Sequence, residues 1–316
     1  VRVPNRVVLT PGLDDDAQDG HPSDGHLSRF VDLGTTGGGL VQTAPIAVSA
    51  NGRITPGTAG LYDAEHGDAW ATAIDEIEDG SDSVVGAHLV HAGRRGATRS
   101  RRRGLDRPLP AGESWELFAP TAKPYSPANQ KPTPMDEGDL DRVKEAFVRS
   151  TELADEAGFD HLQLHWGHGY LLSSFLSPLT NDRDDEYGGD LDARLRYPFE
   201  VLEAVRETWP VEKPLGITLQ ATDWNGNGFT LAQSTETARR LAEADCDLLS
   251  IVAGQQSPRQ RPDYSETALP DYTDRLRNES GLPALTTHNA TTYDEVNTLV
   301  GSGRADLCTF HPAALE

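Results

Sequence analysis

"MDEGDLDRVKEAFVRSTELADEAGFDHLQLH", residues 135–165, is the stretch that decides the expected fold. Its first part opens with acidic residues, continues as an amphipathic pattern and ends at Gly158, so we expect a helix over 138–157. The run HLQLH at 161–165 is short and bounded by turn signals, which favours a strand. The stretch therefore predicts one helix followed by one strand.

The same alternation recurs along the whole chain. The runs that favour strands are 6–10, 39–43, 84–90, 161–165, 215–220, 248–253, 284–288 and 306–310. The stretches that favour helices are 26–34, 64–78, 138–157, 192–208, 231–244, 270–280 and 292–302. Alternating strands and helices imply a parallel sheet, and eight strands imply a closed (β/α)8 TIM barrel. A doubly wound sheet instead requires a Gly-rich fingerprint after the first strand, and the segment PGLDDD at 11–16 lacks one.

We expect a single domain over residues 1–316, because no internal repeat or low-complexity linker divides the chain. The sequence ends shortly after the last predicted strand, so the eighth helix is expected to be truncated. A long loop excursion, 91–135, follows the third strand and carries the basic cluster RRGATRSRRRG at 94–104. Such a cluster is either a solvated arm, which is the ordinary case, or a site for an anionic group such as a coenzyme A phosphate.

Acidic residues dominate the composition. Asp and Glu total 50 against 28 Lys and Arg, and only 4 of those 28 are Lys, which gives a formal net charge of −22. An acidic, Lys-poor surface stays hydrated when salt screens charge, so we interpret the chain as a halophile's cytoplasmic protein, with an acidic mesophilic protein as the alternative. The charge argues against nucleic acid as a partner, because phosphates need a basic face.

The cysteine count and the hydropathy pattern exclude other classes. Cys246 and Cys308 are too few for a disulfide framework or an iron–sulfur cluster. No apolar run is long enough to predict a membrane span, and the N-terminal VRVPNRVVLTP has no signal-peptide pattern. We therefore expect a cytoplasmic protein without a membrane partner.

Candidate catalytic residues cluster where the fourth predicted strand ends. Catalytic groups of such barrels lie at the carboxyl ends of strands; His165 ends this strand, and His168 and Tyr170 follow in the next loop. If the loop makes one helical turn, the two imidazoles share a face and could donate to one acceptor atom. The phenol beside them keeps its proton up to about pH 10. These groups suit polarisation of a C=C–C=O unit, hydride addition at the β carbon and protonation at the α carbon.

Two other interpretations of these residues stay open. A lone His is more often a buried side chain whose hydrogen bonds are satisfied within the protein. The spacing His-x-x-His-x-Tyr also resembles a zinc site, but zinc requires a third protein ligand and no partner is obvious, so we expect no metal.

Longer motifs surround these three residues. HWGHGYL (165–171) and FLSPLTNDRDDEYGG (175–189) resemble the hallmark of the Old Yellow Enzyme family, the FMN-dependent ene-reductases and NADH:flavin oxidoreductases. That hallmark is His-x-x-His/Asn-Gly-Tyr-Leu, then Phe-Leu-Ser-Pro-x-x-Asn-x-Arg-x-Asp-x-Tyr-Gly-Gly. Further family-like segments are NGRITPGTAGLYDAEH (51–66), HAGRRGATR (91–99) and GRADLC (303–308). ATDW (221–224), GQQSP (254–258) and DRLRNESGLP (274–283) look most like the reductase half of the anthraniloyl-CoA or salicylyl-CoA monooxygenases.

The resemblance implies a TIM barrel that binds FMN and takes hydride from NAD(P)H. His165 and His168 would hold the carbonyl of an enone or CoA-thioester substrate, and Tyr170 would give the proton. Thr10 and Pro11 would lie against the isoalloxazine ring. The branch also suggests a homo-oligomer or a monooxygenase partner module.

Several positions depart from the family pattern on the flavin side. His88 stands where the family has a Gln that contacts the flavin, and Thr218 stands where it has an Arg near flavin N1. Near the phosphate, His288 and Asn289 replace a Gly, and His311 stands in place of a Gly-Arg pair. A phosphate dianion prefers Arg or open backbone N–H groups, so we interpret these five residues as cofactor contacts that weaken FMN binding.

The sequence therefore supports two functions. The first is an FMN-dependent NAD(P)H oxidoreductase that reduces the activated C=C of an α,β-unsaturated carbonyl, with a CoA-linked ring compound as one candidate substrate. The alternative is a degenerate barrel that binds flavin weakly or not at all and acts as a binding or assembly partner. A yellow protein supports the first, and a protein that stays colourless with added FMN supports the second.

Overall fold

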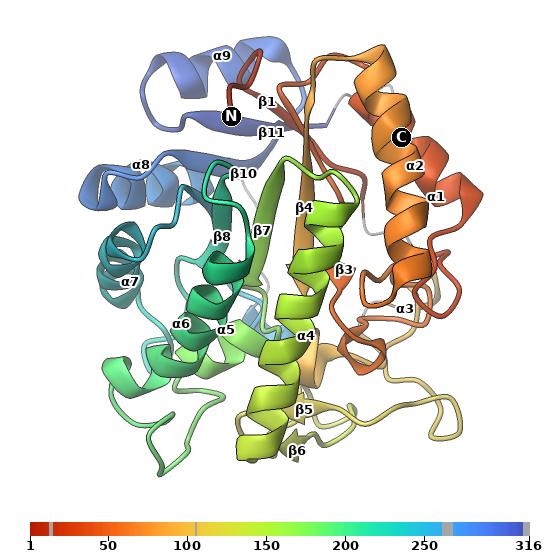
Figure 1. The fold of residues 1–316 in the computed structure, drawn as a ribbon. Coiled ribbons are helices and arrows are strands. Elements are labelled where there is room, and N and C mark those ends of the chain that lie inside the picture. Colours follow the sequence, from red (N-terminus) through yellow and green to blue (C-terminus); the bar gives the residue numbers. More distant parts are fainter. Residues whose placement is uncertain (13–14, 105, 261–267, 312–316) are drawn as a thin grey trace.

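Eight parallel strands close into a barrel in the computed structural model, which describes residues 1–12, 15–104, 106–260 and 268–311. The strands are β1 (Val7–Leu9), β2 (Leu40–Gln42), β4 (Val84–Val90), β7 (His161–Trp166), β8 (Leu215–Gln220), β9 (Leu248–Val252), β10 (Ala284–Ala290) and β11 (Leu307–Phe310). Each pairs in parallel with its neighbours, and β1 pairs with both β2 and β11, which closes the ring. The predicted TIM barrel is confirmed (Figure 1).

Helices between the strands surround the barrel. They are α1 (Asp24–Gly34), α2 (Ala64–Gly80), α4 (Glu137–Glu156), α6 (Leu191–Thr208), α7 (Leu231–Glu243), α8 (Ala268–Ser280) and α9 (Tyr293–Gly301). Capping boxes begin three of them: Asp136 and Asp139 at α4, Thr230 and Gln233 at α7, and Thr292 and Glu295 at α9. Each box satisfies backbone N–H groups that the first helical turn leaves free, so the sequence sets these helix starts.

Short elements complete the described part of the chain. They are β3 (Ile46–Ala47), α3 (Arg101–Gly104), β5 (Phe118–Ala119), β6 (Thr133–Pro134), α5 (Leu171–Leu176) and the 3-10 helices η1 (Ala50–Gly52), η2 (Gly93–Arg95) and η3 (Pro258–Gln260). The excursion at 91–135 contains η2, α3 and the small β5–β6 sheet. The expected truncation of the last helix falls after His311, outside the described residues.

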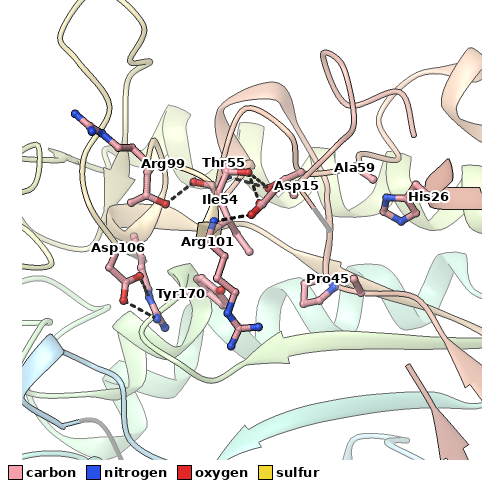
Figure 2. Close-up of a pocket in the computed structure, with 14 residues that line it drawn as sticks. Asp15, His26, Pro45, Ile54, Thr55, Ala59, Arg99, Arg101, Asp106 and Tyr170 are labelled. Carbon is pink, nitrogen blue, oxygen red and sulfur yellow. Dashed lines mark hydrogen bonds and ion pairs between the residues drawn. The ribbon is translucent and has the colours of Figure 1, made fainter. Parts of the chain in front are cut away.

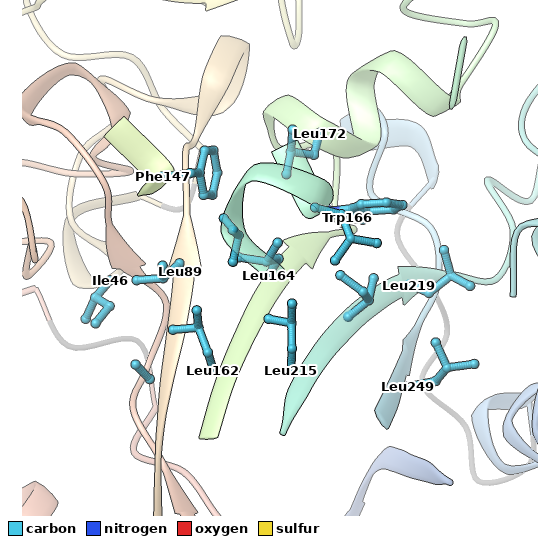
Figure 3. Packing of buried hydrophobic residues seen from close by; sticks show 14 of the residues in the cluster. Ile46, Leu89, Phe147, Leu162, Leu164, Trp166, Leu172, Leu215, Leu219 and Leu249 are labelled. Atoms are coloured by element: carbon cyan, nitrogen blue, oxygen red, sulfur yellow. The ribbon is translucent and has the colours of Figure 1, made fainter. Parts of the chain in front are cut away.

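Apolar side chains pack on the outside of the barrel, and polar ones face its axis near the site. Leu162, Leu164 and Trp166 of β7 join the cluster between the barrel and the helices (Figure 3). Because side chains alternate along a strand, the other three residues of β7 face inward. A separate apolar cluster near the amino ends of the strands closes the floor of the barrel: Val8, Leu40, Val84, Leu248, Leu285 and Leu307.

No helix among the described residues combines the length and the apolarity needed to cross a membrane.

Candidate active site

A left-handed turn after β7 presents the predicted catalytic residues. His168 has φ of 56° and Gly169 has φ of 74°, a conformation that residues with a Cβ seldom adopt. A Cβ at Gly169 would lie 2.6 Å from the Gln255 carbonyl oxygen, so only glycine fits there. The His168 backbone N–H donates to Gln220 Oε1 at 3.1 Å, which fixes the turn against the end of β8.

The structure brings His165, His168 and Tyr170 together at the carboxyl end of the barrel. Ring centroids are 5.2 Å apart for His165 and His168, 5.0 Å for His165 and Tyr170, and 6.5 Å for His168 and Tyr170. His165 and Tyr170 are buried, and His168 is partly exposed. The Nε2 atom of His165 is buried and has no hydrogen-bond partner among the described residues. A buried nitrogen without a partner is costly unless a ligand or water reaches it.

Burial keeps all three groups in their uncharged forms at neutral pH. It lowers the pKa of His168 to about 3, with a smaller contribution from the nearby Arg95 guanidinium. It also holds the pKa of His165 well below 6.5, helped by His88. Burial raises the pKa of the Tyr170 phenol against the opposing charge of Arg95. The site therefore offers neutral imidazoles and a protonated phenol.

Arg95 supports this cluster and was not predicted as a site residue. Its Nη1 donates to the His168 carbonyl oxygen at 2.6 Å, and its guanidinium lies 5.3 Å from the centroid of the Tyr170 ring. The buried Asp106 carboxylate accepts two hydrogen bonds from it, at 2.9 and 3.1 Å. Arg95 thus holds the backbone turn and the phenol ring with a single planar group.

A cavity of about 30 Å³ lies against Tyr170. Its lining includes Ala44 and Pro45, which follow β2, and Arg99 and Arg101 of the excursion. Figure 2 shows Pro45 and Arg101 beside Tyr170, with the Arg99 side chain directed away from it. Arg99, Arg101, Arg102 and Arg103 of the basic cluster are all exposed, and the first two also line this cavity.

Two predicted cofactor residues also join the cluster. His88 Nε2 lies 2.8 Å from His165 Nδ1 and 3.1 Å from Thr218 Oγ1, and the two imidazole rings are stacked with centroids 4.8 Å apart. Burial lowers the pKa of His88 to about 3, with smaller contributions from His168 and His161. The substrate side and this part of the predicted flavin side therefore share one hydrogen-bonded network.

The remaining predicted cofactor residues lie at other strand ends. Thr10 and Pro11 follow β1, and the Thr10 hydroxyl donates to the Pro11 carbonyl oxygen at 3.1 Å. His311 follows β11, and its N–H donates to the Ala290 carbonyl oxygen at 2.9 Å. The side chains of His288 and Asn289 lie outside the described part of the structure.

Gln163 and Gln220 were missed in the sequence, although a signal was present. In HLQLHW, polar residues alternate with apolar ones, and the polar set faces the barrel axis. The Gln163 side-chain amide is hydrogen-bonded to the Thr218 hydroxyl at 3.0 Å, and Gln220 accepts from the turn at His168. Among the described residues, no group of three or more His, Cys, Asp or Glu is arranged to hold a metal ion.

Residues 1–315 match the NADH:flavin oxidoreductase / NADH oxidase family. The chain belongs to this family. Its NADPH dehydrogenase relative from Geobacillus sp. (strain WCH70) is 30% identical over 309 residues, which cover 97% of this chain and 85% of the relative. The NADPH dehydrogenase of Bacillus subtilis (strain 168) is 26% identical over 308 residues, 96% of this chain and 85% of that protein.

Solved structures show the same fold. A 2-naphthoyl-CoA reductase in complex with 2-naphthoyl-CoA superposes with a TM-score of 0.84 and 23% identity over 98% of this chain, although the match spans only 48% of that protein. Morphinone reductase superposes with a TM-score of 0.79 and 20% identity, covering 98% of this chain and 82% of that protein. The old yellow enzyme homologue from Zymomonas mobilis superposes with a TM-score of 0.79 and 21% identity, covering 98% of this chain and 86% of that protein.

Family membership confirms the predicted resemblance to the Old Yellow Enzymes. The chain is a flavin-dependent NAD(P)H oxidoreductase.

Proposed function

We propose that this oxidoreductase passes hydride from NAD(P)H, through FMN, to the β carbon of an α,β-unsaturated carbonyl compound. The observation that carries the proposal is the convergence of two neutral imidazoles and a buried phenol, with His165 Nε2 left without a partner among the described residues. A substrate carbonyl oxygen placed there would satisfy that buried nitrogen.

The donor set suits a flavin ring. His88 and Thr218 are neutral groups inside the barrel beside His165, and neutral donors and acceptors match the carbonyl and N–H edge of oxidised flavin. We propose that these two residues, with Thr10 and Pro11, hold the ring, and that His288, Asn289 and His311 lie toward its phosphate. When bound, the flavin supplies the hydride.

The residues of this chain then have separate tasks. His165 and His168 donate hydrogen bonds to the substrate carbonyl oxygen, which orients the substrate and stabilises the negative charge that develops there. Tyr170 keeps its proton because burial raises its pKa, and it gives that proton to the α carbon. Ala44 and Pro45 cover the cavity beside the phenol, and help to keep water away from the reacting carbon.

We further propose that the substrate carries an anionic handle, as a CoA thioester does. Arg99 and Arg101 line the cavity beside Tyr170, so they offer positive charge there on a chain whose net charge is −22. The 2-naphthoyl-CoA reductase that shares the fold is named for a CoA thioester, which agrees with this choice. The cytoplasmic location, the homo-oligomer and the monooxygenase partner module stay predictions.

The first test is optical. The purified protein should be yellow or become so on addition of FMN, and a phenol such as 4-nitrophenol should perturb the flavin absorbance as it binds. His165→Ala and His168→Ala should each weaken phenol binding by roughly 5- to 150-fold, because each removes a hydrogen bond of about 1–3 kcal/mol. The exposed His21→Ala serves as the control. A protein that stays colourless with FMN would contradict the proposal and favour the binding or assembly role.

The second test concerns the handle. Arg99→Gln and Arg101→Gln should lower kcat/KM for a CoA thioester while changing little for a truncated thioester without phosphates. Arg102→Gln is the matched control, because Arg102 is exposed and does not border the cavity. Equal effects of all three substitutions on both substrates would exclude an anionic handle at this place.

A further inference from the structure

An unbroken line of polar side chains crosses the inside of the barrel below the active site. From Pro214 to His165, the links are Pro214 O to His161 Nδ1 (3.2 Å), His161 Nε2 to Gln163 Oε1 (3.1 Å), Gln163 Nε2 to Thr218 Oγ1 (3.0 Å), Thr218 Oγ1 to His88 Nε2 (3.1 Å) and His88 Nε2 to His165 Nδ1 (2.8 Å). The interior of a TIM barrel is more commonly filled by branched apolar side chains. A continuous row of polar side chains in this place is therefore unusual for the fold.

We propose that Gln163, Thr218 and His88 form a relay of hydrogen bonds that keeps the proton of His165 on Nε2, and so act as positioning residues for the substrate carbonyl. The inference rests on the proposed function, because it assigns His165 to that carbonyl. It adds an explanation of why Nε2 of His165 carries the proton. A neutral imidazole has one N–H, and His165 can donate to a ligand only from Nε2 because its Nδ1 faces His88.

The polarity of the relay is set at its far end. The Pro214 carbonyl oxygen can only accept, so His161 places a proton on Nδ1. Burial lowers the pKa of His161, against smaller opposing effects of Gln163, Pro214, Asp247 and Asp160, so its Nε2 is an acceptor at neutral pH. The Gln163 amide must then turn its NH2 group toward Nε2, a 180° rotation that exchanges the amide oxygen and nitrogen. Gln42, 3.4 Å from Gln163, can turn its own amide in the same way.

The remaining steps follow from donor and acceptor matching. With the Gln163 oxygen facing Thr218, the Thr218 hydroxyl donates to it and its oxygen accepts from His88 Nε2–H. That same N–H lies 2.8 Å from His165 Nδ1, which therefore accepts, and the His165 proton resides on Nε2. If His161 carried a second proton, each bond would reverse, and His165 would present a lone pair that repels a carbonyl oxygen.

The decisive experiment reads the tautomer itself. In the full chain labelled with 15N-histidine, protonated and unprotonated imidazole nitrogens have well-separated chemical shifts, and the His165 signals are assigned by their loss in His165→Gln. The parent should show a protonated Nε2 and an unprotonated Nδ1. Thr218→Val removes the hydroxyl at nearly constant volume and should produce a mixture of both tautomers, whereas Thr218→Ser should restore the parent pattern.

A matched control lies on the neighbouring strand. Ser250 is opposite Thr218 in the β8–β9 register and faces the same interior, but its hydroxyl has no hydrogen-bond partner among the described residues. Ser250→Ala should leave the His165 shifts unchanged. If Thr218→Val does not fold, Gln163→Met interrupts the relay one step earlier.

Phenol binding separates this inference from the proposed function. Thr218→Val should weaken 4-nitrophenol binding by about two- to tenfold, because apparent affinity falls with the fraction of His165 protonated on Nε2. A single Nε2–H tautomer in Thr218→Val would overturn the relay and leave the carbonyl site intact. A parent protein that binds no phenol, with His165 still protonated on Nε2, would overturn the proposed function and leave the relay standing.

Discussion

Replacing Asp106 by Asn should destabilise the protein and disturb the active site together. Asp106 and Arg95 form an ion pair in which the side chains are only 7% and 5% exposed, with bonds of 2.9 and 3.1 Å. Asn suits this position in the backbone, because Asp106 has φ of 59°, a region that Asn tolerates well. The substitution therefore removes the charge and leaves the local backbone conformation undisturbed.

The expected cost follows from the burial of the pair. Removing one partner of a buried ion pair leaves an uncompensated charge and typically costs about 3–5 kcal/mol. Asn retains one acceptor for the guanidinium, so we expect the lower end, about 3 kcal/mol. For a chain of 316 residues, whose entropy of unfolding is about 0.66 kcal/mol/K, that corresponds to a fall in Tm of roughly 4–5 °C. Because Arg95 also donates to the His168 carbonyl oxygen, phenol affinity should decrease as well.

Equilibrium unfolding in urea, followed by circular dichroism, measures this change. Asp182→Asn is the control, because Asp182 pairs with Lys123 at the surface, where the side chains are 61% and 39% exposed, and such pairs contribute about 0–1 kcal/mol. The double variant Arg95→Met/Asp106→Asn should recover much of the stability, since no charge remains buried and Asn suits the backbone at position 106. A loss in Asp106→Asn no larger than in Asp182→Asn would refute the reasoning.

Three further outcomes are expected. Tyr170→Phe should slow substrate reduction by about 10²–10⁴-fold and affect flavin reduction by NAD(P)H much less, which stopped-flow kinetics of the two half-reactions will show. The free energy of unfolding should fall as pH drops below about 6.5, because His88 and His168 stay neutral in the fold with pKa values of about 3. At pH 5 each of these residues accounts for a loss of up to about 2 kcal/mol, and the His88→Gln variant should lose less stability between pH 7 and pH 5 than the parent, as urea unfolding at the two pH values will show. Tm should rise with KCl, because salt screens repulsion among charges that sum to −22; a Tm independent of salt would argue against a halophilic protein.

Patterns local in sequence predicted the barrel, because its strands and helices each carry their own signals. No end of a predicted barrel strand or major helix differs from the structure by more than two residues. The helix α5 was missed for a physical reason: all six residues of LLSSFL are buried, so it has no polar face and no helical periodicity. The short strands β3, β5 and β6 have two residues each, which is below the length at which alternation can be recognised.

The sequence predicted that three polar side chains converge after β7, and it missed the residues that support them. His165, His168 and Tyr170 lie within six residues of one another, so one turn brings them together. Arg95 resembles its basic neighbours in sequence, and only the fold shows that it is buried against Asp106 while Arg102 is exposed. The contact between His88 and His165 joins positions 77 residues apart, and depends on ring orientations that no sequence pattern specifies.

The two departures from the family pattern on the flavin side explain each other. His88 replaces a Gln and Thr218 replaces an Arg, and in this structure the two side chains are 3.1 Å apart although 130 residues separate them. A guanidinium at position 218 would only donate hydrogen bonds, so His88 would have to accept on Nε2. His165 would then donate from Nδ1 to His88, and its Nε2 would carry no proton. A hydroxyl can donate and accept, so Thr218 allows His88 to donate toward His165. On the proposed relay, Thr218 and His88 therefore act as one unit of the same hydrogen-bond network, and the two departures from the family pattern are one change.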